Sequence, residues 1–283
     1  MRGPTTEVLQ DMESVGLAPS KPSAIIFDTP GMVRYHVQGD KAGSRNGYWR
    51  GFSDGRPAGI FGSWKTGASH HWISGDPVTV TDEDRARIQL IQRQREQEQT
   101  AEHERVSEIA TAQYSGLPDA TGTLYTERKR ITPFGAKQRG NSLVLALVDW
   151  SGKIWSLQTV YQDGTKRMLK GGKKRGLHIH IGGNPDGRLL ICEGFATGCS
   201  LRQMDPDAEA IAAVDAHNMR LVAESARQRF PEREIVLCGD HDPVGIRCAE
   251  GAARAIGGLV LIPPEAGQDW NDFLVANAQG GGK

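Results

Sequence analysis

The sequence predicts an α/β protein in which a parallel sheet flanked by helices follows two β-rich parts and a long helix. In residues 24–73, short apolar or aromatic runs alternate with Gly turns, and a highly charged helical run comes next. After Gly183, four short apolar runs are separated by helical segments, which is typical of parallel sheets with helices on both faces. The predicted parts are a small N-terminal antiparallel β module (1–76), a long charged helix or linker (77–117), a basic β-rich part (118–183) and a C-terminal α/β domain (184–283).

The N-terminal module contains the dipeptides Asn46-Gly47 and Asp54-Gly55, which favour tight turns between antiparallel strands. Its basic and aromatic side chains suit stacking on the bases of a single strand, but a small module also needs aromatic side chains for its own core. The sequence supports both interpretations equally. The side chains concerned are Arg34, Tyr35, Lys41, Arg45, Tyr48, Trp49, Trp64 and Lys65.

The charged helix has start and stop signals in the sequence. Thr81 is its expected N-cap, acids crowd its first turn, and Gly116-Leu117-Pro118 ends it. The apolar stripe along this run is thin, so we expect a spacer or arm that carries no catalytic side chain.

Charge is unevenly distributed along a chain whose formal net charge is zero. Residues 128–175 hold 12 Lys and Arg but two acids, whereas residues 176–283 hold nine Lys and Arg and 15 acids. A basic block followed by an acidic block indicates a polyanion-binding surface beside a cation-binding centre; a merely solvated basic face is the alternative. Four basic residues of the first block are predicted to contact nucleotide or nucleic acid: Lys129, Lys173, Lys174 and Arg175.

The cysteines predict neither disulfides nor a structural zinc site. Cys192 and Cys238 lie in apolar strand-like runs, where a free thiol packs as a small hydrophobe, so we expect reduced cysteines and a cytoplasmic protein. No Cys/His set has zinc spacing, and His178 with His180 is interpreted as a structural pair on one strand face. No apolar run is long enough to span a membrane and no apolar signal segment is seen, so no membrane partner is expected.

Acids follow several strands of the C-terminal domain. The predicted strands are Leu189–Cys192, Ala210–Val214, Ile235–Gly239 and Leu259–Ile262. Glu193 follows the first strand, and Asp240 and Asp242 follow the third. Asp269 lies beyond the fourth strand. Because ligands of open parallel sheets bind beyond the carboxyl ends of the strands, we expect these acids to meet in one crevice.

Further residues are predicted to support this crevice. Gly194 and Gly245 would let a phosphate or a metal approach the backbone closely. Asn218 lies beyond the second strand. Two acids have a second interpretation: Asp215 as an ordinary helix N-cap, and Asp272 as a first-turn acid of the last helix.

Carboxylates gathered in one crevice raise one another's pKa unless a cation is bound. Oxygen ligands without His or Cys partners favour Mg²⁺ or Mn²⁺. Such an ion beside a basic surface suits metal-assisted phosphoryl transfer, in which Lys and Arg neutralise the remaining phosphate charge.

Two segments resemble a known family. The segments "CEGFATG" (192–198) and "GDHDPVG" (239–245) resemble the signatures of the Toprim domain, a Glu-Gly after the first strand and DxDxxG after the third. Thr197 stands where cellular bacterial primases have an acid, and this variant resembles the EGYAT-type primases of conjugative plasmids and satellite or prophage elements. "QDWNDF" is similar to the third acidic element of these primases, which fits Asp269. Upstream, Lys166 and Arg167 fall where the family has a basic residue that contacts nucleotide phosphate or template, and Arg139 is similarly placed.

The resemblance implies the catalytic core of a DNA primase, which makes short RNA primers on single-stranded DNA from ribonucleoside triphosphates. No Walker motif occurs, so a replicative helicase would lie in a separate chain or domain. The catalytic acids and metal ligands that the resemblance implies are Glu193, Asp240, Asp242 and Asp269. A Toprim-type nuclease that uses the same acids and a non-catalytic single-strand-binding replication module are the alternatives.

Overall fold

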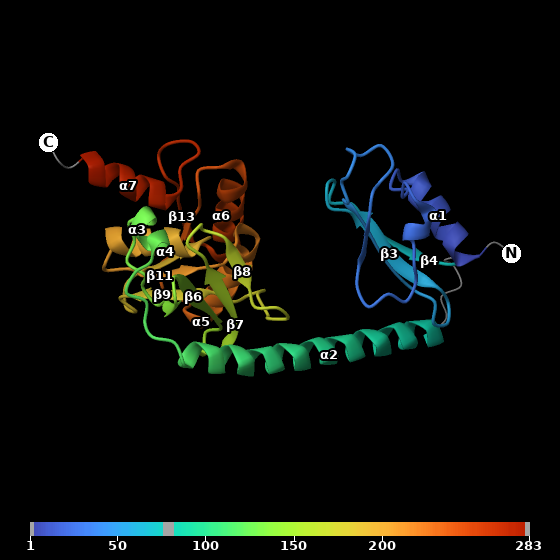
Figure 1. Cartoon of the computed structure of the whole chain (residues 1–283), viewed down its shortest axis with the longest axis horizontal. Coiled ribbons are helices and arrows are strands. Elements are labelled where there is room, and N and C mark those ends of the chain that lie inside the picture. The colour runs from blue at the N-terminus through green and yellow to red at the C-terminus, as the bar shows by residue number, and fades with distance from the viewer. Residues whose placement is uncertain (1–2, 76–81, 281–283) are drawn as a thin grey trace. The chain divides into compact units, whose positions relative to one another are not determined.

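The chain divides into two units, Met1–Arg95 and Glu96–Lys283, and each is described by itself. The computed structural model describes residues 3–75 and 82–280, without the side chains at 82–92, 94–96, 98 and 279–280. The predicted N-cap Thr81 and the predicted 76/77 boundary lie outside the described residues. Figure 1 shows the elements of both units.

The first unit is built on an antiparallel sheet, as predicted, with the strand order β1-β2-β3-β4. Its elements are α1 (Pro4–Ser14), the 3-10 turn η1 (Pro22–Ala24), β1 (Val33–Tyr35), β2 (Gly47–Phe52), β3 (Ala58–Ser63) and β4 (Ser69–Ile73). The side chains of Val8 and Met12 on α1 pack with Trp49 and Trp72 in a buried core. The helix α1 was not predicted from the sequence, and it covers one face of the small sheet.

One of the two predicted turns of this sheet is confirmed and the other is wrong. Asp54-Gly55 forms the β2–β3 turn, with Gly55 at a φ of 79°. Asn46-Gly47 does not form a turn, because Gly47 begins β2. A Cβ on Gly47 would lie 2.4 Å from the Tyr35 ring, so this glycine makes room for a buried aromatic side chain.

The long helix α2 (Asp82–Ser115) spans the division between the units. Its C-terminal half packs on the second unit, where Val106 and Ala110 are buried. Ser107 donates a hydrogen bond to the carbonyl oxygen of Ile154. The helix was expected to be a spacer, but its C-terminal half also forms part of the buried core of the second unit.

The second unit begins with a basic antiparallel sheet of order β5-β6-β7-β8. Its elements are α3 (Leu124–Lys129), β5 (Lys137–Arg139), β6 (Ser142–Val148), β7 (Ile154–Val160) and β8 (Lys166–Met168). The dipeptides Ser151-Gly152 and Asp163-Gly164, which favour tight turns, lie between β6 and β7 and between β7 and β8. Their glycines have φ values of 84° and 88°, which other residues rarely adopt.

The C-terminal sheet has the order β13-β12-β10-β11-β9. Its elements are β9 (Ile179–Gly183), β10 (Leu189–Cys192), α4 (Phe195–Met204), β11 (Glu209–Ala212), η3 (Ala216–Asn218), α5 (Met219–Arg229), β12 (Ile235–Cys238), α6 (Pro243–Ile256), β13 (Leu259–Leu261) and α7 (Trp270–Gly280). Four strands are parallel, as predicted, and β9 adds an antiparallel edge. Two buried clusters cover its faces, one including Phe195 of α4 and the other including Val222 of α5 and Ala252 of α6.

The position of β9 differs from the predicted domain division at 183/184. This strand belongs by sequence to the basic β-rich part, yet it pairs with β11 of the C-terminal sheet. An isolated bridge between Val148 and His178 continues from it to β6, so the two sheets of the second unit are joined through backbone hydrogen bonds. All four cysteines are free, as expected. None of the helices described here is long and apolar enough to cross a bilayer.

Candidate functional site

The acids after β10 and β12 emerge at the same edge of the C-terminal sheet. These strands are parallel neighbours, and Cys192 lies opposite Cys238 at their ends. Both strands are fully buried along their length. Glu193 follows Cys192 directly, and Asp240 follows Cys238 after one glycine. The register of two buried strands therefore places these two carboxyl groups side by side at the sheet edge.

Asp240 has the most perturbed carboxyl group of this edge. Its pKa is raised to about 7, first by burial and then by the charges of Glu193, Asp269 and Asp242, while Lys166 opposes the increase. Its Oδ1 atom is buried and, among the described residues, accepts no hydrogen bond. A buried carboxylate oxygen without a donor is unfavourable unless a proton or a cation meets it.

Glu193 is partly buried in the same neighbourhood. Burial raises its pKa, the positive charge of Lys166 lowers it, and Asp215 and Asp242 raise it again. The Nζ atom of Lys166 lies 3.6 Å from the position that a Cβ on Gly194 would occupy. The lysine on β8 thus brings positive charge to both acids.

Asp242 holds the first turn of α6 against Asp240. Its Oδ1 atom accepts hydrogen bonds from the backbone N–H groups of Val244 and Gly245, each at 2.8 Å. A Cβ on Gly245 would lie 2.5 Å from the carbonyl oxygen of Asp240. A side chain at position 245 would therefore collide with the backbone of Asp240, so the close approach of Asp240 requires a glycine here.

Asp269 and Asp272 begin α7 together. The Oδ1 atom of Asp269 accepts a hydrogen bond of 2.7 Å from the N–H of Asp272, and Oδ2 of Asp272 accepts one of 3.4 Å in return. Asp272 thus acts as the first-turn acid that the alternative interpretation expected. The Nζ atom of Lys129 lies 3.8 Å from Oδ2 of Asp269, so Lys129 is placed beside an acid of the site.

Asn271 positions this helix, a role that was not predicted from the sequence. Its side chain is 1% exposed. The Nδ2 atom donates to the carbonyl oxygen of Lys129 at 2.6 Å and to Oγ of Ser200 at 2.9 Å. Asn271 therefore ties α7 to both α3 and α4. It lies within the quoted "QDWNDF" segment, but its burial depends on helices that the sequence does not place.

The two basic residues predicted on β8 point to opposite faces of the strand, as alternation requires. Lys166 interacts with the acids, whereas the Arg167 guanidinium lies 5.6 Å from the Tyr161 ring centroid. Arg139 is on β5 at the other edge of the same sheet, and it donates to the side chain of Gln113 on α2. The structure therefore brings only Lys166 of these three to the acidic edge.

The loop before β9 carries the remaining predicted basic residues. Lys174 forms an ion pair of 2.5 Å with Asp215, and the Lys173 ammonium lies 4.5 Å from the Trp155 ring centroid. Arg175 is exposed. Lys174 thus neutralises an acid, while Lys173 and Arg175 contribute positive charge to the surface.

Asn218 fixes this loop to the sheet. Its side chain is 4% exposed; it donates to the carbonyl oxygens of Leu177 and Ala213 and accepts from the N–H of Gly176. Asp215 accepts from the N–H of Asn218 at 3.0 Å and is the N-cap of η3, as its alternative interpretation expected.

The donor chemistry of this edge fits a hard divalent ion. Within the described ranges, no three His, Cys, Asp or Glu side chains are arranged closely enough to hold a metal ion. Carboxylates repel one another when no cation lies between them, so we do not expect them to converge to metal-ligand distances without a bound ion. The unpartnered Oδ1 atom of Asp240 and the neighbouring carboxylate oxygens are the ligand type that Mg²⁺ and Mn²⁺ prefer. Thr197 is buried in the first turn of α4 and adds no acid.

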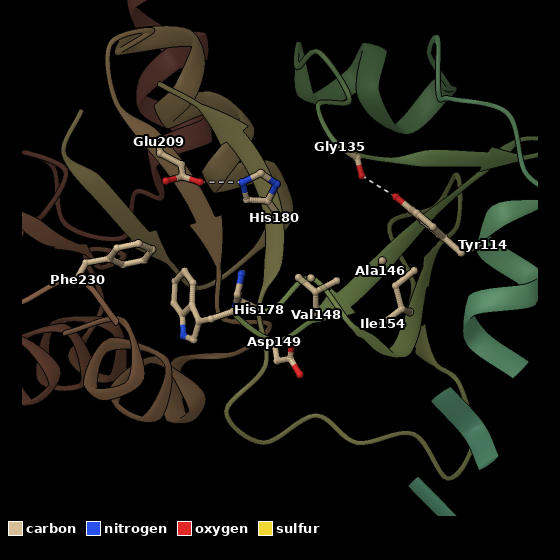
Figure 2. A pocket seen from close by; sticks show the side chains of 12 residues that line it. Tyr114, Gly135, Ala146, Val148, Asp149, Ile154, His178, His180, Glu209 and Phe230 are labelled. Atoms are coloured by element: carbon tan, nitrogen blue, oxygen red, sulfur yellow. Dashed lines mark hydrogen bonds and ion pairs between the residues drawn. The ribbon is translucent and has the colours of Figure 1, made fainter. Parts of the chain in front are cut away.

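A separate cavity of about 460 Å³ lies between the two sheets of the second unit and includes none of these acids (Figure 2). His180 pairs with Glu209 at 2.8 Å on one side of it, and Tyr114 donates to the carbonyl oxygen of Gly135 on another. The ring of His178 lies 4.2 Å from that of Trp150. Burial lowers the pKa of His178 to about 4. His180 therefore has a polar partner, whereas the buried ring of His178 packs on Trp150 and its Nδ1 atom has no hydrogen-bond partner among the described residues.

Comparisons with known proteins agree with these features. The Toprim domain family matches residues 188–280. Two Escherichia coli proteins named DNA primase TraC are each 30% identical over 81% of this chain, covering 17% and 24% of their own lengths. This chain thus spans a quarter or less of these relatives.

Solved structures give partial similarities. The primase fragment of the bacteriophage T7 primase-helicase protein aligns with a TM-score of 0.44 and 15% identity, over 57% of this chain and 76% of that one. A DNA primase domain from Pseudomonas aeruginosa aligns with a TM-score of 0.36 and 18% identity, over 50% and 49%. The segment that matches the Toprim domain family, residues 188–280, contains Glu193, Asp240 and Asp242. Residues 188–280 are therefore a Toprim domain, in a chain that is similar over most of its length to DNA primases.

Proposed function

We propose that this chain is the catalytic core of a DNA primase, a nucleotidyltransferase that makes short RNA primers on a single-stranded DNA template. The observation that carries the proposal is the environment of the Asp240 carboxyl group. Its pKa of about 7, its unpartnered Oδ1 atom and the three acids around it describe a site that needs a cation, at the edge of a Toprim domain. The similarity to proteins named DNA primase supports the same conclusion.

Glu193, Asp240, Asp242 and Asp269 would hold Mg²⁺ or Mn²⁺. When bound, the ion would stabilise the negative charge of the phosphates as a nucleotide is joined to the primer and pyrophosphate leaves. Lys166 would offset part of the triphosphate charge, because its positive charge acts on both Glu193 and Asp240. The N–H groups of Val244 and Gly245 would keep Asp242 oriented.

Single-stranded DNA would follow the basic surface that adjoins Lys166. Trp155 lies on this surface between two ammonium groups, at 3.9 Å from Lys153 and 4.5 Å from Lys173. Its indole N–H donates to Asp149 at 2.7 Å, which fixes the ring plane. Ribonucleoside triphosphates would be the second substrate, and a replicative helicase in another chain or domain would be the partner.

Primer synthesis tests the proposal directly. Purified protein is incubated with single-stranded DNA, labelled ribonucleotides and Mg²⁺ or Mn²⁺, and the products are resolved by size. We expect oligoribonucleotides that disappear in Glu193→Gln and Asp240→Asn. Asp186→Asn is the matched control, because Asp186 is an exposed acid in the turn before β10 and lies away from the site. Template cleavage without primers would show a nuclease, and DNA binding without either product would show a non-catalytic module.

A further inference from the structure

The first unit carries a sheet face that the catalytic proposal does not use. Side chains of the four strands alternate between two faces. Trp49, Phe61 and Trp72 point to the face covered by α1 and form the buried core. The residues between them in sequence point to the other face. We call this the open face. It carries the side chains of Arg34, Tyr48, Arg50, Ile60, Trp64 and His71.

The aromatic part of the open face is exposed and preorganised. Trp64 directly follows β3 and is 62% exposed, unlike Tyr35 and Trp49, which are buried. Its ring lies 4.9 Å from that of Tyr48, and its backbone N–H is held by the carbonyl oxygen of Asn46. The Tyr48 ring lies over Gly62, where a Cβ would approach its hydroxyl within 2.4 Å. A large ring is therefore presented to solvent on a fixed support.

The charge of the open face is positive. The four strands contain no Asp or Glu. Arg34 and Arg45 each donate to the backbone carbonyl oxygen of the other, at 3.1 and 2.9 Å. Within residues 3–75, no carboxylate forms an ion pair with either guanidinium. Arg50 projects from the same face and lies 5.4 Å from the Phe52 ring centroid. These cations are held by neutral groups, so their charge is available to a polyanion.

We propose that the open face of the first unit binds single-stranded DNA, with a base stacked on Trp64 and the phosphates near Arg34, Arg45 and Arg50. An exposed aromatic ring beside cations suits a strand whose bases are unstacked, whereas the bases of a duplex are not available for stacking. Positive charge on strands that contain no acid disfavours a basic protein partner. The choice of DNA as the strand rests on the proposed function; the site itself lies outside the acidic edge.

Tryptophan fluorescence of the full chain tests the stacking. A short oligothymidylate is added without metal or nucleotides, and quenching is compared between the wild type and Trp64→Phe. The chain has six Trp residues, so the difference between the two isolates the signal of Trp64. We expect less quenching in Trp64→Phe than in the wild type, because the contribution of Trp64 is lost while that of Trp155 on the basic surface remains. Equal quenching in both proteins would overturn the proposal.

Anisotropy of a labelled oligothymidylate measures the affinity. Because stacking on one base contributes about 1–3 kcal/mol, Trp64→Ala should weaken binding about fivefold or more, and Trp64→Phe should retain most of the affinity. The matched control is Val15→Ala, which removes an exposed apolar side chain at the end of α1. An effect of Val15→Ala as large as that of Trp64→Ala would contradict a specific stacking site.

Salt dependence tests the cations. The double variant Arg34→Gln/Arg45→Gln should reduce the slope of log K against log salt by about 0.7 for each cation removed. Lys21→Gln, an exposed charge of the same unit outside the open face, should leave the slope unchanged. Tighter binding of duplex DNA, or of an RNA strand of the same sequence, would overturn the assignment of the strand.

Primer synthesis separates this proposal from the proposed function. A protein that makes no primers but shows the Trp64 signal would contradict the primase assignment alone. A protein that makes primers with no Trp64 signal would contradict the open-face assignment alone.

Discussion

Asn271 donates a hydrogen bond of 2.6 Å to the carbonyl oxygen of Lys129, and through it the start of α7 is held against the end of α3. The acid beside it, Asp269, lies 3.8 Å from the ammonium of the same Lys129. A buried amide thus sets the position of a predicted metal ligand. Buried side-chain hydrogen bonds of this kind are expensive to break, because the partners are left without water.

We expect Asn271→Ala to lower the free energy of unfolding by about 1–3 kcal/mol, since the carbonyl oxygen of Lys129 and the hydroxyl of Ser200 lose a donor. Urea unfolding measures this change. Asn277→Ala is the control on the same helix, because Asn277 is exposed. Equal effects of the two variants would show that the buried hydrogen bonds contribute nothing specific.

Two glycines of α6 should respond to alanine in opposite directions. A Cβ on Gly245 would lie 2.5 Å from the carbonyl oxygen of Asp240, so Gly245→Ala should destabilise the protein by about 1–3 kcal/mol and displace Asp240. Nothing lies within 4 Å of a Cβ on Gly251, so Gly251→Ala should stabilise it by about 0.4–1 kcal/mol. Thermal unfolding of both variants gives the two signs. A stable Gly245→Ala protein would mean that α6 does not press on Asp240.

The pKa of Asp240 gives the metal-free protein a characteristic pH dependence. The ordinary pKa of this carboxyl is 3.8 and its folded value is about 7, so the native state binds more protons than the unfolded chain between these values. The free energy of unfolding contributed by this group is therefore present in acid and is lost as the pH rises through about 7. Urea unfolding in a chelator at several pH values measures it.

Asp240→Asn should flatten this dependence, and Asp186→Asn should leave it unchanged. Added Mg²⁺ or Mn²⁺ should stabilise the wild type more at high pH than at low pH, because the ion competes with the proton for the carboxylate. Stability that rises from pH 4 to pH 7 through Asp240 would contradict the raised pKa.

The neighbours Lys166 and Arg167 should have different effects on the acids. Lys166 lowers the pKa of Asp240 and of Glu193, so Lys166→Gln should raise both. Arg167 lies over Tyr161 on the other face of β8, so Arg167→Gln should leave both pKa values unchanged. Carboxyl carbon NMR titration follows the groups, with Asp240 assigned from the signal missing in Asp240→Asn. Equal shifts in both variants would place Arg167 at the site as well.

The parts of the site that follow from strand order could be predicted from the sequence. Apolar runs identify β10 and β12 as buried strands, and parallel strands end at one edge, which brings Glu193 to Asp240. The turns of the basic sheet also follow from the sequence, because Gly152 and Gly164 supply φ values that few other residues tolerate.

The parts that depend on packing could not be predicted. Gly245 was assigned to ligand access, and its close contact with the backbone of Asp240 was not foreseen; Gly47 was assigned to a turn, yet it accommodates Tyr35. In both cases the glycine is needed because another part of the protein packs where a side chain would lie. These contacts depend on the tertiary fold and are not visible in the sequence. Arg139 also fits a basic block by sequence, but the strand order places it three strands from Lys166.

The edge strand β9 decides which pieces of this chain can be separated. A fragment beginning at residue 184 would leave one side of β11 with unsatisfied backbone groups, and exposed edges of this kind pair with other chains. The backbone bonds between Val148 and His178, at 2.8 and 3.1 Å, extend the dependence to the preceding sheet. Any recombination or engineered fusion that moves this domain to another protein should therefore keep the basic sheet and the C-terminal sheet together on one segment.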